Sequence, residues 1–142
     1  MSRRAGPGLL ATVGLVLSLT GAYRPMGECP PSAGLKAGSV ADHGVATAGE
    51  RTLALEAGDS YYGPTCQIDV PTGEVQVQVK NTGRLLRNIS FEDPAIDQDV
   101  APGETVTVAV RMGKEPRQFS CKYHRGAGMV GALLPGGART TR

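Results

Sequence analysis

Three side chains that bind soft metal ions lie close together near the end of the sequence. They are the thiol of Cys121, the imidazole of His124 and the thioether of Met129, all within nine residues. This donor set suits copper better than calcium, magnesium or zinc, because thiolate and thioether sulfur favour copper(I) and imidazole favours copper(II). Gly126 and Gly128 lie between them and allow the chain to fold back. We therefore expect one copper ion, bound by Cys121, His124 and Met129.

The rest of the composition limits the kind of site. The chain of 142 residues contains two histidines, three cysteines and four methionines, which excludes a multi-histidine metal site and a four-cysteine zinc site. No paired carboxylates, Ser-His-Asp series or phosphate-binding glycine loop occurs in a supporting context, so we expect no enzyme activity. The net charge is +2 with no dense basic run, so we expect no nucleic-acid partner.

The first residues have the features of an export signal. Arg3 and Arg4 precede an uncharged, mostly apolar run from Leu9 to Ala22 that ends in small residues. We expect residues 1–22 to be a signal peptide, and the alternative is an uncleaved membrane anchor. The protein would then be secreted or periplasmic, and would contact a membrane only through an uncleaved N-terminal segment.

The segments on either side of the central region resemble a linker and a tail. Residues 23–50 are rich in Gly, Ala and Pro and lack periodicity, which predicts a flexible linker containing His43. Residues 135–142 predict a disordered tail.

The three cysteines allow one disulfide, which an exported protein is expected to form. A bridge between Cys29 and Cys66 leaves the thiol of Cys121 free for a metal. A bridge between Cys66 and Cys121 abolishes the metal site, and the sequence leaves both pairings open.

Patterns of period two predict β-strands between residues 51 and 134. In residues 74–80 three valines alternate with four polar residues, and similar patterns occur over 53–57, 66–70, 89–91, 106–110 and 119–121. Turn sequences such as Pro102-Gly103 separate these runs. About seven or eight short strands predict an all-β, Greek-key β-sandwich with an aliphatic core over residues 51–134. Asp93, Asp97 and Asp99 lie on a proline-containing connection and are expected to be solvated loop residues.

Several motifs in this region resemble the cupredoxin (type 1 blue copper) family, in particular its plastocyanin-like members. Phe-x-Cys-x-x-His-Arg-Gly-Ala-Gly-Met-Val-Gly at 119–131 is similar to the family's ligand loop, and segments 62–73, 79–83 and 101–105 are similar to its strands and turns. The resemblance covers about residues 51 to 134. It implies a cupredoxin-like sandwich with copper at one end, single-electron transfer and a redox partner protein; we expect a monomer. It also implies Cys121 as the thiolate ligand, His124 as the C-terminal imidazole and Met129 as the axial thioether.

The sequence departs from the family at the second histidine ligand. The position that should hold it, shortly after the Asn-x-Gly turn, is Arg87, followed by the expected Asn88. Arginine stays protonated, so it cannot act as an ordinary ligand and its charge repels a metal ion.

Three alternatives follow from this departure. In the first, copper still binds through Cys121, His124 and Met129, with Arg87 turned away and water or nothing in the fourth position, which would favour copper(I). In the second, His43 supplies the missing imidazole, at the cost of closing a long loop. In the third, the metal is lost.

The leading prediction is an exported copper-binding protein that carries single electrons, and the alternative is a metal-free structural or interaction module of the same fold.

Overall fold

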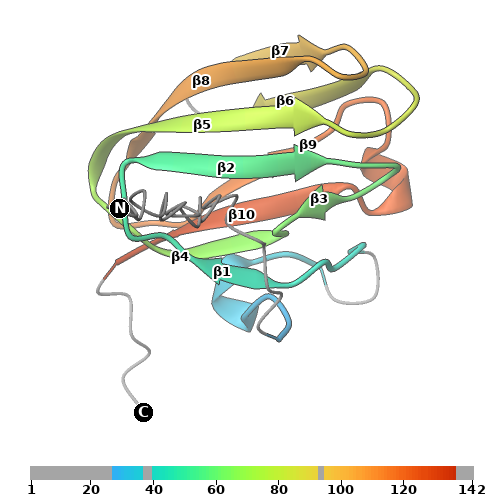
Figure 1. Cartoon of the computed structure of the whole chain (residues 1–142). Helices are drawn as coiled ribbons and strands as arrows, with labels where there is room; N and C mark the ends of the chain where they lie inside the picture. Colours follow the sequence, from blue (N-terminus) through green and yellow to red (C-terminus); the bar gives the residue numbers. More distant parts are fainter. Residues whose placement is uncertain (1–26, 37–39, 93–94, 137–142) are drawn as a thin grey trace, which may run out of the picture.

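Two β-sheets packed face to face make up the molecule (Figure 1). The computed structural model describes residues 27–36, 40–92 and 95–136. One sheet has six strands in the order β1-β4-β10-β9-β6-β7, and the other has four strands in the order β3-β2-β5-β8. The predicted all-β sandwich is confirmed.

The described elements follow one another along the chain as ten strands and two short 3-10 helices. They are η1 (Pro31–Ala33), β1 (Val45–Thr47), β2 (Thr52–Ala57), β3 (Tyr62–Gly63), β4 (Cys66–Val70), β5 (Gly73–Asn81), β6 (Arg87–Phe91), β7 (Ile96–Val100), β8 (Thr105–Met112), β9 (Arg117–Ser120), η2 (Arg125–Ala127) and β10 (Val130–Pro135).

The core between the sheets is mainly aliphatic, as the alternating patterns predict. Val75, Val77 and Val79 of β5 are fully buried, and β5 lies between β2, which is parallel to it, and β8, which is antiparallel. The opposite sheet contributes Phe91 and Phe119 to the same core. Each valine removed from water in this way contributes about 1.5–3 kcal/mol to stability.

Strand β4 changes face part-way along its length. Cys66 and Ile68 belong to a second apolar cluster, together with Ala132 of β10, whereas Val70 packs into the main core. Asp69 has a φ of +54°, in the left-handed region, and this rotates the chain between the two faces. The expectation that residues 66–70 alternate regularly is therefore wrong at Asp69.

The segment predicted as a flexible linker is folded onto the sandwich where the structure describes it. β1 pairs in parallel with β4, and Ala33 of η1 and Val45 are buried in the second apolar cluster. The prediction fails because these residues cover an apolar outer face of the six-stranded sheet instead of lying in solvent. Pro135, assigned to the tail, ends β10. Residues 1–22, 23–26 and 137–142 lie outside the described residues, so the predicted signal segment is among them.

A disulfide links this N-terminal segment to the sheet. Cys29 and Cys66 are bonded, with their Cα atoms 5.5 Å apart, and the thiol of Cys121 is free and buried. The alternative bridge between Cys66 and Cys121 is thereby excluded. The bridge spans a sequence separation of 37 residues, and closing such a loop restricts the unfolded chain. Within the described part of the chain, no helix is long and apolar enough to cross a membrane.

Gly131 of β10 permits the close packing of the site-bearing strands. It lies opposite Phe119 of β9, and a Cβ atom at Gly131 would clash with the Phe119 ring and with the carbonyl oxygen of Thr65. The residue therefore has to be glycine for the ring to occupy its place in the core.

We predict that Gly131→Ala lowers the free energy of unfolding by about 1–3 kcal/mol, because the ring and the backbone must move to accept a methyl group. Urea denaturation measures this effect. Gly126→Ala is the matched control: an added Cβ at Gly126 meets no atom within 4 Å, so a change below about 0.5 kcal/mol is expected. Equal effects of the two substitutions would contradict the packing argument.

Candidate functional site

The loop between β9 and β10 contains the three predicted copper ligands. Backbone hydrogen bonds close it: the N–H of Cys121 donates to the carbonyl oxygen of Met129 (3.0 Å), the N–H of Met129 to that of His124 (3.3 Å), and the N–H of His124 to that of Cys121 (3.1 Å). Gly128 ends η2 with a φ of +83°, which turns the chain back toward β10. The main chain at the three residues is thus brought together, as the loop prediction requires.

The donor side chains differ in burial. Cys121 and Met129 are fully buried in the main core, whereas His124 is partly exposed. Cys121 points inward because it lies two residues beyond Phe119, and alternate side chains of a strand share a face. The loop lies at the same end of the sandwich as the β2–β3 and β5–β6 connections (Figure 1). The loop at this end therefore carries a buried thiol, a buried thioether and a partly exposed imidazole.

The described residues contain no group of three or more His, Cys, Asp or Glu side chains placed to hold a metal ion. Only Cys121 and His124 of the candidate set belong to those types, so its third donor must be the thioether of Met129.

Arg87 lies inside the sandwich next to this loop. It begins β6, and its side chain is only 2% exposed. Arg87, Ile89 and Phe91 are buried at alternate positions of β6, so they share its inner face. The strand pairs with β9 through Phe91 and Phe119, which directs the inner face of β6 toward the Cys121 end of β9. Arg87 is therefore buried, and the first alternative, in which it is turned away from the three candidate ligands, stays a prediction.

The guanidinium of Arg87 is only partly satisfied. Its Nη2 donates to Oδ1 of Asp59 at 2.9 Å, but Nε and Nη1 are buried with no hydrogen-bond partner among the described residues. Leaving a buried donor unpaired costs about 1–3 kcal/mol. Most buried donors in folded proteins are hydrogen-bonded, either to protein groups or to ordered water.

Tyr62 lies within electrostatic reach of both Arg87 and Cys121. Its hydroxyl donates to the carbonyl oxygen of Asn88, and its ring meets that of Phe119 edge to face with centroids 4.9 Å apart. Burial raises the pKa of Tyr62 well above its usual value; negative charge at Cys121 raises it further and the positive charge of Arg87 lowers it. Tyr62 therefore remains a protonated donor.

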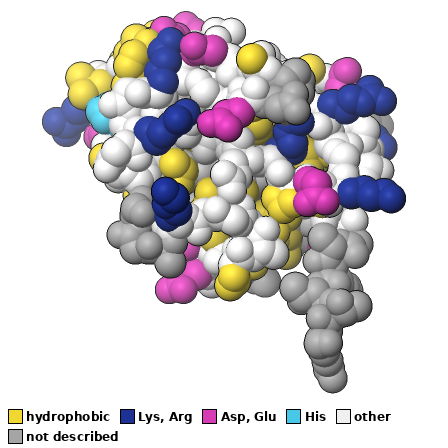
Figure 2. Space-filling view, turned by 180° about the vertical axis from the view of Figure 1, so that it is seen from behind, with side chains coloured by type: hydrophobic (Ala, Val, Ile, Leu, Met, Phe, Trp, Pro, Cys, Tyr) yellow, Lys and Arg dark blue, Asp and Glu magenta, His cyan; other side chains and the backbone are white. Residues whose placement is uncertain are grey.

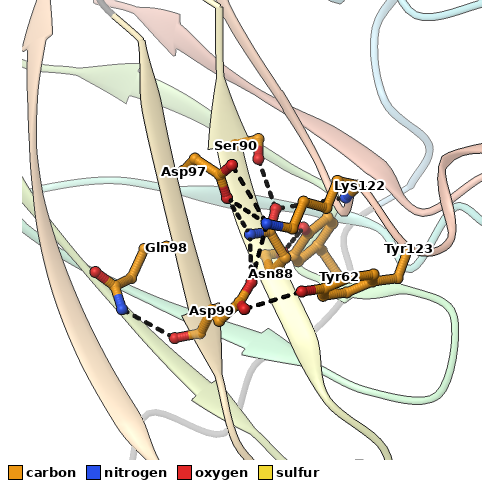
Figure 3. Close-up of polar contacts among 8 residues, drawn as sticks. All are labelled: Tyr62, Asn88, Ser90, Asp97, Gln98, Asp99, Lys122 and Tyr123. Atoms are coloured by element: carbon orange, nitrogen blue, oxygen red, sulfur yellow. Dashed lines mark hydrogen bonds and ion pairs between the residues drawn. The ribbon is translucent and has the colours of Figure 1, made fainter.

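Asn88 holds the ligand loop against β6 (Figure 3). Its buried amide nitrogen donates to Oδ1 of Asp97 (2.7 Å) and Oδ1 of Asp99 (2.9 Å). Its amide oxygen accepts from the hydroxyl of Ser90 and, at 3.4 Å, from the backbone N–H of Lys122, the residue after Cys121. Asn88 thereby fixes the main chain beside the thiol.

The two aspartates also hold the exposed side of the loop. Nζ of Lys122 lies 3.1 Å from Asp97 and 3.5 Å from Asp99, and the hydroxyl of Tyr123 donates to Asp99 at 2.9 Å. Asp97 and Asp99 lie on β7, so the expectation that they are loop residues is wrong, although their side chains are solvated as expected, 59% and 44% exposed; Asp93 lies outside the described residues.

These contacts lower the pKa values of both carboxyls. The hydrogen bond from Asn88 is the largest cause for each; Lys122 adds to it at Asp97, and Tyr123 at Asp99. A carboxyl whose pKa is lower in the folded state stabilises the fold above its unfolded value, about 3.9, and that contribution is lost as the pH falls through the folded value.

We predict that the difference in free energy of unfolding between the wild type and Asp97→Asn/Asp99→Asn is largest near pH 6 and shrinks below about pH 4, where the wild-type carboxylates become protonated. Denaturation at a series of pH values measures it. The exposed Glu104→Gln is the control, and its difference from the wild type should not narrow in that range. If the difference in free energy of unfolding between the wild type and the double variant did not change with pH, the lowered pKa values of Asp97 and Asp99 would be contradicted.

Sequence reasoning missed Asp59 and Tyr62 as parts of the site. Asp59 comes from the β2–β3 connection and lies 28 residues before Arg87. No local pattern links the two positions, and Gly58-Asp59-Ser60 predicts only a turn. The backbone N–H of Arg84 and the side chain of Arg87 both donate to Asp59, and these bonds, in that order, lower the pKa of its carboxyl.

His43 is the residue on which the second alternative depends. Its ring is exposed and stacks on Tyr61 with centroids 3.7 Å apart, while its backbone N–H donates to Oγ1 of Thr65. Because Cys121 and Met129 are inside the core, the structure gives no support to His43 as their fellow ligand.

Comparison with known proteins identifies the fold. No protein-family model and no curated protein sequence matches the chain. Reduced auracyanin from the photosynthetic bacterium Roseiflexus castenholzii superimposes with a TM-score of 0.53 and 20% identity, over 62% of this chain and 98% of that one. A Cu(I) form of an amicyanin variant gives a TM-score of 0.50 and 12% identity, over 62% and 85% of the two chains. The chain therefore has a cupredoxin fold.

Proposed function

We propose that this protein binds a single copper ion, in the copper(I) state, through Cys121, His124 and Met129. The observation that carries the proposal is the closed loop that groups a free buried thiol, a buried thioether and a partly exposed imidazole. Thiolate and thioether are the ligands that copper(I) prefers. When bound, copper supplies the exchange of one electron, and the exposed part of His124 is the route by which a redox partner protein would reach it.

The residues fit three ligands and do not fit a site with two imidazoles. Arg87 stands where the family resemblance expects the second histidine, and a guanidinium donates hydrogen bonds but does not bind metals. The chain's own contribution is to hold the donors rigid: Asn88 fixes the backbone at Lys122, and the loop hydrogen bonds fix Met129. Rigid donors lower the rearrangement needed when an ion enters or changes oxidation state.

One observation favours a second candidate, a metal-free interaction module. Cys121 and Met129 fill the core, and Arg87 is buried at the start of β6. A buried cysteine and methionine are also ordinary core residues. Copper binding itself distinguishes the two candidates.

We predict that the purified full chain binds one equivalent of copper(I) in anaerobic competition with a coloured copper(I) chelator. Cys121→Ser should abolish measurable binding, and Met129→Leu should weaken it by about tenfold or more, a loss of at least about 1.4 kcal/mol. Met112→Leu is the control, because Met112 is a buried methionine of β8 outside the loop. Failure of the wild type to compete would leave the metal-free module.

We predict that Arg87→His creates, or strongly intensifies, a visible thiolate-to-copper charge-transfer band when copper(II) is added, because it supplies a second imidazole. Absorption spectra of the variant and the wild type measure it. Arg84→His places an imidazole at an exposed position of the β5–β6 connection and should leave the spectrum unchanged. If Arg87→His also leaves it unchanged, Arg87 does not face the metal.

A further inference from the structure

We propose that Arg87 sets the ion preference of the site: its buried charge favours monovalent soft cations, copper(I) and silver(I), over divalent copper(II) and zinc(II). This inference rests on the proposed three-ligand site and adds to it a residue that sets specificity by charge. Nothing in the donor set alone would exclude divalent ions, since thiolate and imidazole also bind zinc.

The first support is that the charge of Arg87 is permanent and interior. A guanidinium remains protonated at any pH the fold survives, and this one is 2% exposed. It begins the strand next to β9, on the face that meets the core containing Cys121 and Met129. An ion that enters the site therefore meets a fixed positive charge inside the protein, where water screens it little.

The second support is that this charge is poorly neutralised. The Nη2 atom pairs with Asp59, whose side chain is 61% exposed, so that water weakens the carboxylate's effect. Nε and Nη1 have no hydrogen-bond partner in the described residues. The nearby carboxylates of Asp97 and Asp99 are held by Asn88 and Lys122 instead.

The net charge of the site depends on the charge of the ion that it binds. With Cys121 as a thiolate, the thiolate and Arg87 sum to zero, because His124 and Met129 are neutral ligands. A monovalent ion then leaves one net positive charge in the site, and a divalent ion leaves two. At the same distance Arg87 repels a divalent ion twice as strongly as a monovalent one, and at an effective dielectric constant of about 20 this repulsion is about four times its value in water. The ion pair with Asp59 sets how much of this repulsion remains.

The test compares affinities for monovalent and divalent ions in four full-length variants. Silver(I) and copper(I) are measured by chelator competition, and zinc(II) and copper(II) by the corresponding competition for divalent ions. Arg87→Gln removes the charge and should raise divalent affinity by about tenfold or more while changing monovalent affinity much less. Arg87→Lys keeps the charge and should keep the wild-type preference. Arg84→Gln, at an exposed arginine, is the control for charge on the surface.

Asp59→Asn tests the same proposal without altering the buried residue. It removes the partial neutralisation of Arg87 and should lower divalent affinity further, by a few-fold, with a smaller effect on copper(I). Thermal unfolding of each variant, measured in parallel, shows that binding is compared between folded proteins; if Arg87→Gln does not fold, the comparison of Asp59→Asn with the wild type decides.

The possible results separate the two proposals. If Arg87→Gln changes monovalent and divalent affinities by the same factor, or Asp59→Asn leaves their ratio unchanged, Arg87 is a structural residue and the charge-selection proposal fails while copper binding stands. If the wild type binds copper(II) or zinc(II) as tightly as copper(I), the charge-selection proposal also fails. If the wild type binds no copper(I) or silver(I), both proposals fall.

Discussion

The buried guanidinium of Arg87 is the constraint around which this end of the sandwich is organised. Enclosing an ionised group in a protein interior costs several kcal/mol unless other groups compensate it. Here Asp59 reaches in from the β2–β3 connection to pair with one nitrogen, while the other two remain unpaired in the described structure. This cost falls at the start of β6, and in the proposal above the buried charge is part of the copper site.

The loop beside Arg87 is rigid for reasons independent of any ion. Asn88 joins β6, β7 and the ligand loop through one side chain, and the backbone bonds from Cys121 to Met129 close the loop upon itself. Gly131 lets Phe119 pack closely behind the thiol. A loop fixed in this way would hold the donors of the proposed copper site in place before an ion arrives.

Sequence patterns predicted the parts of this structure that depend on neighbouring residues. The alternating valines of β5 and the spacing of Cys121, His124 and Met129 are local, and both the sandwich and the closed loop followed from them. The pairing of Cys29 with Cys66 was one of two open alternatives. What failed depended on distant contacts or on a single backbone angle: the packing of Ala33 and Val45 of the predicted linker in the second apolar cluster, and the change of face at Asp69. No local sequence pattern indicates the ion pair between Arg87 and Asp59. In β7 the apolar residues Ile96 and Val100 give only a weak strand pattern, because Asp97 and Asp99 lie between them.

The central claim is that one thiolate, one thioether and one imidazole bind copper(I) next to a buried guanidinium. X-ray absorption at the copper edge of the copper(I)-loaded full chain tests this most directly, because it counts the sulfur and nitrogen atoms around the ion. The account predicts two sulfur neighbours and one nitrogen neighbour, at roughly 2.0–2.3 Å, with one sulfur lost in Met129→Leu. A first shell made only of nitrogen and oxygen, or one unchanged in Met129→Leu, would contradict it.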